Sequence, residues 1–359
     1  MTLNLMLGLG AVLLLALAVI FGLSRWAMRS QARFARLALL TTVLTFILIV
    51  VGAYVRLSDA GLGCPDWPGC YGEPHVPEVL PASHGEGVPA GGFDAAKGWK
   101  EMGHRYLASF VGMLIAALAL AALRARRSLG RSPILPLLLV LVVIAQAALG
   151  RWTVTLLLKP AIVTLHLIGG MTTLALLVWI TLGASRRFEI PIRIDAAARV
   201  RGLALLGLLA VCLQIVLGGW VSTNYAALAC PDLPGCQGQW VPPMSFAHAF
   251  DVLRELGRTG DGGLLPLEAL TAIHWVHRLG AIGVFVVALW LGLRLVRIGS
   301  LKSLGVLLVV LVCLQLALGM GNVLFSLPLW LAAAHNAGAA GVLVTMVVIN
   351  YALSRSGNS

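Results

Sequence analysis

The chain carries EMGHR at residues 101–105 and a related pentapeptide, HWVHR, at residues 274–278. Each stands at the head of a long apolar run, and in the first an acid and an imidazole, Glu101 and His104, are three residues apart. On a helix that spacing places both side chains on one face. An ionisable side chain at the centre of a membrane costs about 2.5–3.5 kcal/mol on insertion scales unless it is partnered or near the surface. The pair therefore indicates a functional site, and its return 173 residues later indicates a chain built twice around it.

Composition places the chain among integral membrane proteins. Of its 359 residues, 59% are hydrophobic and 11% are charged, and its mean hydropathy of +0.94 is far from that of soluble domains. Nine apolar stretches are long enough to cross a bilayer. They are predicted at 3–24, 37–55, 104–123, 133–151, 161–182, 202–222, 272–293, 303–322 and 332–353. The first has no basic residue before it and no small-residue cleavage pattern after it, which favours a retained helix over a signal peptide.

The net charge of +12 does not indicate nucleic acid, because the basic residues cluster in alternate connections between the apolar stretches. The clusters lie at 25–36, 124–131, 186–201 and 294–302. The positive-inside rule assigns these connections to the cytoplasm. The sequence therefore predicts a multi-pass protein of the inner (plasma) membrane. Its N-terminus and its long, Gly- and Pro-rich connections are predicted outside, on the periplasmic side, and its C-terminus in the cytoplasm.

Several motifs recur at nearly constant shifts. GAYV 52–55 and CPDWPGC 64–70 return 166 residues later as GGWV 218–221 and CPDLPGC 230–236, and Gln146, Gly150 and His166 return 169 residues later as Gln315, Gly319 and His335. Four crossings bring the chain back to its starting side, so the halves are parallel repeats. The predicted fold is an all-α integral membrane protein with two tandem four-helix transmembrane bundles and one appended N-terminal helix. Its predicted divisions are 1–35 for the appended helix and its basic loop, 36–185 for the N-terminal half, 186–200 for a cytoplasmic linker and 201–355 for the C-terminal half.

Four of the eight histidines lie at the predicted outer ends of membrane helices: His104 and His166 in the first half, His277 and His335 in the second. Two imidazoles that face each other at one level of a four-helix bundle are what axial ligation of a haem iron requires. The alternative is polar residues hydrogen-bonded near the interface, and its weight falls because the arrangement occurs twice. Zinc is a weaker alternative, since the loop cysteines are spaced by five residues. The histidines of the outer loops are interpreted as solvated: His75, His84 and His248.

Four arginines near these histidines are candidates for holding haem propionates, with snorkelling to lipid head groups as the alternative. They are Arg56, Arg105, Arg151 and Arg278. His274 stands where the first half has Glu101. This difference between the repeats suggests that one half performs chemistry and the other holds a cofactor.

The six cysteines are of two kinds. Cys212 and Cys313 lie inside apolar runs and are predicted to pack as small hydrophobes. The other four form two pairs in the outer connections: Cys64 with Cys70, and Cys230 with Cys236. An oxidising compartment permits disulfides there. A structural bridge that constrains the unfolded chain by about 2–3 kcal/mol is one reading, and a redox or haem-handling role for the first pair is the other.

These residues resemble the haem A synthase family, in its cysteine-containing subgroup. The resemblance rests on GAYVRL 52–57, CPDWPGC 64–70, EMGHR 101–105 and the four histidines, and it covers about residues 37–353. It implies an oxidoreductase that oxidises a ring methyl group of haem O to formyl, giving haem A for cytochrome c oxidase. The family pattern usually has eight helices, so the appended ninth is a departure.

The resemblance also implies a role for each histidine. His104 and His166 would bind the substrate haem, and His277 and His335 would bind a haem b cofactor. Glu101 matches the family's acidic residue beside the substrate, where it would stabilise charge or move protons. The implied partners are haem O synthase, cytochrome c oxidase assembly factors, the lipid bilayer and an electron partner that the residues do not identify.

Two other classes of membrane protein fit parts of the pattern. A dihaem electron carrier of the cytochrome b type would hold permanent bis-histidine haems in both halves, but it has no need of Glu101. A membrane thiol oxidoreductase would work through Cys64 and Cys70 with a quinone, and the histidines would be incidental. Identification of extracted haems separates the three, because the synthase alone makes haem A and the thiol oxidoreductase needs no haem.

Overall fold

The computed structural model describes residues 3–78, 93–127, 132–185, 190 and 192–355. The long helices are α1 (Leu3–Met28), α2 (Gln31–Leu57), α3 (Ala95–Arg124), α4 (Ile134–Thr155), α5 (Pro160–Ala184), α6 (Ile194–Thr223), α8 (Leu267–Val296), α9 (Lys302–Leu324) and α10 (Leu329–Arg355). In this described part, eight of them, α2 to α6 and α8 to α10, are long and apolar enough to cross a membrane. The predicted all-α membrane fold is confirmed. His84, and residues 186–189 and 191 of the predicted linker, lie outside the described residues.

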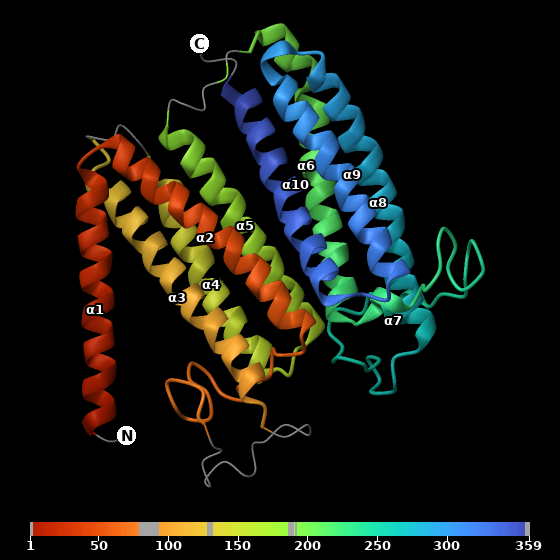
Figure 1. Cartoon of the computed structure of the whole chain (residues 1–359), viewed down its shortest axis with the longest axis horizontal. Helices are drawn as coiled ribbons and strands as arrows, with labels where there is room; N and C mark the ends of the chain where they lie inside the picture. The colour runs from red at the N-terminus through yellow and green to blue at the C-terminus, as the bar shows by residue number, and fades with distance from the viewer. Residues whose placement is uncertain (1–2, 79–92, 128–131, 186–189, 191, 356–359) are drawn as a thin grey trace.

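The membrane helices form two rings of four (Figure 1). In the first ring α2 packs on α3, α3 on α4, α4 on α5 and α5 on α2; in the second, α6, α8, α9 and α10 repeat that order. The rings meet through α10, which packs on α2 and α5, and through α5, which packs on α6. Helix α1 packs on the outside of α2 and α3. The helices in each ring therefore follow the order that the parallel repeat predicts.

The described parts of both long connections, 58–78 with 93–94 and 224–266, lie at one end of the rings, which we call the loop end (Figure 1). Helix α1 begins at the same end and α10 ends at the opposite one. The second connection contains short helices, η3 (Ala226–Leu228) and α7 (Phe246–Ala249), and a third, η4 (Gly299–Leu301), precedes α9. The two cysteine loops therefore cover corresponding ends of the two rings.

Helix α3 begins at Ala95, so the predicted start at residue 104 is wrong. The Asp94 carboxylate caps the helix by accepting hydrogen bonds from the backbone N–H of Ala96 at 2.9 Å and Lys97 at 3.1 Å. These first turns are polar because they pack under a loop rather than in lipid: a Cβ on Gly63 would lie 2.6 Å from the Lys97 backbone. A prediction of helix bounds from apolar runs alone misses polar helical turns of this kind. Glu101 consequently lies well inside the helix.

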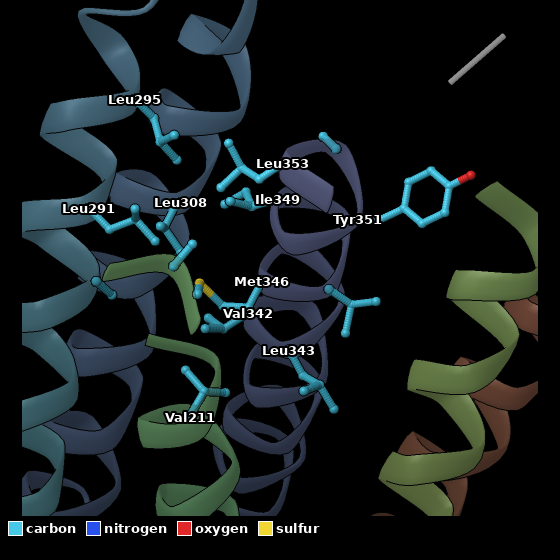
Figure 2. Close-up of a cluster of buried hydrophobic side chains, with 14 of the residues drawn as sticks. Val211, Leu291, Leu295, Leu308, Val342, Leu343, Met346, Ile349, Tyr351 and Leu353 are labelled. Atoms are coloured by element: carbon cyan, nitrogen blue, oxygen red, sulfur yellow. The ribbon is translucent and has the colours of Figure 1, made fainter. Parts of the chain in front are cut away.

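The half of each ring away from the loop end is packed with apolar side chains. Figure 2 shows Val211, Leu291, Leu308 and Met346 converging from four helices of the second ring. On the far side of α10, Tyr351 meets Trp179 of the first ring edge-on at 5.0 Å. Since this half is filled, the polar chemistry of both rings is left to the half nearer the loops.

Cys212 and Cys313 are exposed on the outside of the rings, so the prediction that they pack as small hydrophobes is wrong. A soluble protein would bury such apolar positions. In a bilayer the outward face of a helix is apolar as well, because lipid takes the place of packed side chains. Hydrophobic character alone therefore does not tell an inward from an outward position.

Candidate functional site

Each ring holds two partly buried histidines on diagonally opposed helices. His104 of α3 faces His166 of α5, and His277 of α8 faces His335 of α10. The members of each pair are close enough to interact electrostatically. The structure therefore brings together the residues that the sequence paired, once in each ring.

Every one of these histidines lies against a glycine of the preceding membrane helix. The distances from a Cβ built on the glycine to the imidazole would be 2.9 Å for Gly52 and His104, 3.4 Å for Gly150 and His166, 3.0 Å for Gly218 and His277, and 3.0 Å for Gly319 and His335. Real Cβ contacts are rarely this short, so a larger residue would push the ring aside. Each glycine therefore leaves space for one imidazole and sets how far that side chain reaches toward the centre of its ring of helices.

This arrangement fits a haem in each ring. Nδ1 of His166 and Nδ1 of His335 are buried and make no hydrogen bond, which is costly unless the ring has a further partner. Two imidazoles from opposite helices supply the axial ligands that a haem iron takes, and the surrounding apolar helices suit a tetrapyrrole. Among the described residues there is no cluster of three or more His, Cys, Asp and Glu side chains, which a structural zinc site would need.

Glu101 joins the first histidine helix to the first cysteine loop. Its Oε2 accepts a hydrogen bond from the backbone N–H of Cys64 at 2.9 Å, and its Oε1 pairs with Arg105 at 2.5 Å. Arg105 also donates to the backbone carbonyls of Asp66 at 2.9 Å and Gly69 at 2.5 Å. A buried ion pair of this kind costs about 3–5 kcal/mol when one partner is removed. The carboxylate is therefore held at a defined position, one helical turn from His104.

The second ring repeats this scaffold with a neutral ring in place of the acid. The backbone N–H of Cys230 donates to Nδ1 of His274 at 3.3 Å, and Nε of Arg278 lies 3.3 Å from Nε2 of the same ring. A neutral imidazole accepts at only one of its two nitrogens. Arg278 also donates to the carbonyl of Asp232 at 2.9 Å. His274 and Glu101 are equally buried, each 5% exposed. The two sites therefore differ in the side chain at this position, a carboxyl group in one and an imidazole in the other, while the surrounding loop and arginine are arranged alike.

Both predicted disulfides are present. The sulfur atoms of Cys64 and Cys70 are 1.99 Å apart, and those of Cys230 and Cys236 are 1.97 Å apart. All four cysteine side chains are buried within their loops. The bridges lie directly over Glu101 and His274, because the first cysteine of each pair donates its N–H to that residue.

Comparison of the sequence with known proteins identifies the family of this chain. A family model described as COX15-CtaA, cytochrome oxidase assembly protein, matches residues 35–347. The chain belongs to this family. It is similar to a curated protein named "Heme A synthase" from Shewanella oneidensis, with 42% identity over 89% of this chain and 96% of that protein. Proteins of the same name from Methylobacterium radiotolerans and Halalkalibacterium halodurans are 32% and 27% identical over 87% and 88% of the chain. The resemblance inferred from the motifs is confirmed.

In this COX15-CtaA family member the four candidate arginines do not gather at one place. Arg105 and Arg278 lie under the cysteine loops, bound to backbone carbonyls, which does not agree with snorkelling to lipid head groups. Arg56 donates to the carbonyl of Ser222 at 2.7 Å and stacks over the Tyr225 ring at 4.0 Å. Arg151 is exposed at the loop end of α4. Contact of any of them with haem propionates stays a prediction.

Two sets of contacts in this family member were not predicted from the sequence. Arg56 with Ser222, and Asp59 with Tyr225 through a 3.0 Å hydrogen bond, join equivalent positions of the two halves. Glutamines on three helices contact the histidines or the glycines beside them. The glutamines could have been found from the sequence, because the same spacing between Gln and Gly recurs in the repeated motifs. The outer-loop histidines His75 and His248 are exposed, as predicted.

The second cysteine loop should loosen in acid. Asp232 accepts hydrogen bonds from the backbone N–H of Gly238 at 2.9 Å and Gln237 at 2.5 Å, and these hold the pKa of its carboxyl below the usual value. A depressed pKa in the folded state stabilises the loop above the unfolded pKa of about 3.9, and this stability is lost as the pH falls through the folded value. We expect amide exchange in 230–239, corrected for its intrinsic rate, to rise in acid. Asp232→Asn should show raised exchange already at pH 7, and equal exchange in both proteins at every pH would contradict the capping role.

Proposed function

We propose that this membrane protein is a haem A synthase, which oxidises haem O to haem A for the assembly of cytochrome oxidase. The observation that carries the proposal is a facing pair of histidines in each of two rings, with a buried carboxylate beside one pair and a neutral imidazole in its place beside the other. The family and the names of the curated relatives support the activity. The two alternative classes have no such support.

We assign the exchanged substrate to the N-terminal half and a permanent haem b to the C-terminal half. His104 and His166 then bind haem O, and His277 and His335 bind haem b. The support is the difference between the two scaffolds: Glu101 carries a carboxyl group that can hold negative charge beside the substrate, and His274 has an imidazole in its place. The units are 36–185 and 201–355, joined by a linker at 186–200 and preceded by an appended helix at 1–35.

A haem b in the second ring, when bound, supplies one-electron chemistry. The residues of this chain do the rest. His104 and His166 hold the substrate ring in one orientation, and the packed half of the bundle below them excludes water. Conversion of a ring methyl group to formyl would add one oxygen atom, pass electrons to the external electron partner and leave protons, and so positive charge, near the ring. The Glu101 carboxylate, oriented by Arg105 and the Cys64 N–H, is positioned to stabilise that charge or to accept a proton.

The proposal includes an orientation in the membrane. The described residues of the basic clusters, 25–36, 124–127, 192–201 and 294–302, lie opposite the loop end. The positive-inside rule then sets the cysteine loops on the periplasmic side of the inner membrane and the C-terminus in the cytoplasm. Haem O synthase, oxidase assembly factors and an electron partner are the expected partners within or beside the bilayer.

Identification of the bound haems tests the function. The protein would be produced in a host that makes haem O and has no haem A synthase of its own, and pigments would be extracted and separated by chromatography with mass detection. Haem A is expected, together with haem b and residual haem O. An extract with haem b alone would point to the dihaem carrier, and purified protein without haem would point to the thiol oxidoreductase. Cells with an empty vector provide the control.

A further inference from the structure

Three of the four histidines are accompanied by a glutamine from the preceding membrane helix. Gln214 Nε2 lies 3.0 Å from Nδ1 of His277 and donates to the carbonyl of the same residue at 2.9 Å. Gln315 Nε2 lies 3.4 Å from Nε2 of His335 and donates to its carbonyl at 2.9 Å. The main chain of Gln146 lies beside the His166 ring. Each glutamine stands four residues before the glycine that cradles the same histidine.

A second glycine makes room for each of these amides. It stands three residues after the histidine, and a Cβ there would overlap the glutamine side chain. The pairs are Gly169 with Gln146, Gly280 with Gln214 and Gly338 with Gln315. The glutamine, both glycines and the histidine are therefore one packing unit that joins two helices, and it occurs three times in the chain.

The fourth histidine, His104, has the cradling glycine and lacks the rest of the unit. The position that matches Gln214 is Leu48, and the position that matches Gly280 is Leu107. Leu48 is partly buried and packs against the apolar cluster of the first ring. An alkyl side chain can fill space beside an imidazole, but it offers no hydrogen bond. The His104 imidazole consequently packs against Gly52 without the glutamine and second glycine that accompany the other three imidazoles.

We propose that His104 is the labile ligand, the one that releases the haem bound in the first ring, and that Gln146, Gln214 and Gln315 are positioning residues for the other three. This rests on the proposed assignment of substrate and cofactor. Groups that orient a metal-binding histidine typically contribute 10–100-fold to metal affinity. The helix ring with two such units, at His277 and His335, keeps its haem. The helix ring with one unit, at His166, must take up haem O and release haem A.

Haem dissociation from the full-length protein tests this. The purified protein in lipid nanodiscs would be loaded with haem b, and transfer to an excess of a haem-scavenging apoprotein would be followed optically. Two phases are expected, and a His277→Leu variant identifies the slower one by its loss. Gln214→Met keeps the side-chain length and removes the amide. It should speed the slow phase by about 10–100-fold and shift the low-spin haem signal in electron paramagnetic resonance.

Two further variants complete the experiment. Leu213→Met changes the neighbouring, outward-facing residue of α6, 60% exposed, and should alter neither the rates nor the spectrum. Leu48→Gln combined with Leu107→Gly builds the missing unit and should slow the fast phase. Unchanged dissociation in Gln214→Met, or the same acceleration in Leu213→Met, would overturn the inference. Wild-type protein that takes up no haem would instead overturn the proposed function, so the two failures are distinguishable.

Discussion

Replacement of Glu101 by histidine removes the negative charge and is expected to lower haem A formation by about 10²–10³-fold, the size of one preorganised electrostatic contact, while the low-spin spectrum of the proposed haem b stays intact. Histidine is the informative replacement because His274 occupies the equivalent position in the second ring, where it accepts from a cysteine N–H and contacts an arginine. The variant should therefore keep the loop anchored. Haem O, or a partly oxidised haem, should accumulate. Haem extraction and optical spectra from a haem O-producing host measure both results.

Alanine at the same position would be harder to interpret. It leaves the Arg105 guanidinium without its carboxylate, which costs about 3–5 kcal/mol when such a pair is buried, and it removes the acceptor for Cys64. Loss of activity could then reflect a displaced loop. Glu101→Gln provides the second comparison, since it keeps an acceptor and removes the charge. If Glu101→Gln makes haem A at the wild-type rate, the carboxylate serves only to anchor the loop and its assignment to the chemistry is wrong.

The second large effect is expected at the other ring. His277→Leu, or His335→Leu, removes an axial ligand from the proposed haem b, so the low-spin spectrum and haem A formation should be lost together. A haem held by His277 and His335 would supply one-electron chemistry to the proposed reaction, so its loss would stop haem A formation. The measurement is the reduced-minus-oxidised spectrum of purified protein, alongside haem extraction from the same cells.

His248→Leu is the matched control, since this exposed loop histidine belongs to neither ring. It should retain both the spectrum and the activity. Gel filtration and the two disulfides report whether each variant is folded. A His277→Leu protein with normal haem b content would show that the cofactor binds elsewhere, and one that still makes haem A would show that the second ring is dispensable.

Much of the site could be predicted because it lies in features that a linear pattern preserves. The common depth of His104 and His166, and of His277 and His335, follows from their equivalent positions in the repeated helices. Their facing does not, because it depends on the rotation of each helix in its bundle. The start of α3 could not be predicted from hydropathy, because its polar first turns are stabilised by the Asp94 cap and by contact with Gly63. The exposure of Cys212 could not be predicted either, since lipid and protein interior are both apolar.

The sequence by itself determined that this is a helical membrane protein, that its two halves run parallel, and which histidines, cysteines and acid distinguish its family. These are properties of composition, period and spacing. The tertiary structure alone decided that Arg105 and Arg278 bind loop carbonyls, that Glu101 and His274 occupy equivalent anchoring positions, and that glutamines accompany three histidines but not His104. Such contacts depend on the rotation of each helix and the path of each loop, and packing between distant segments sets both.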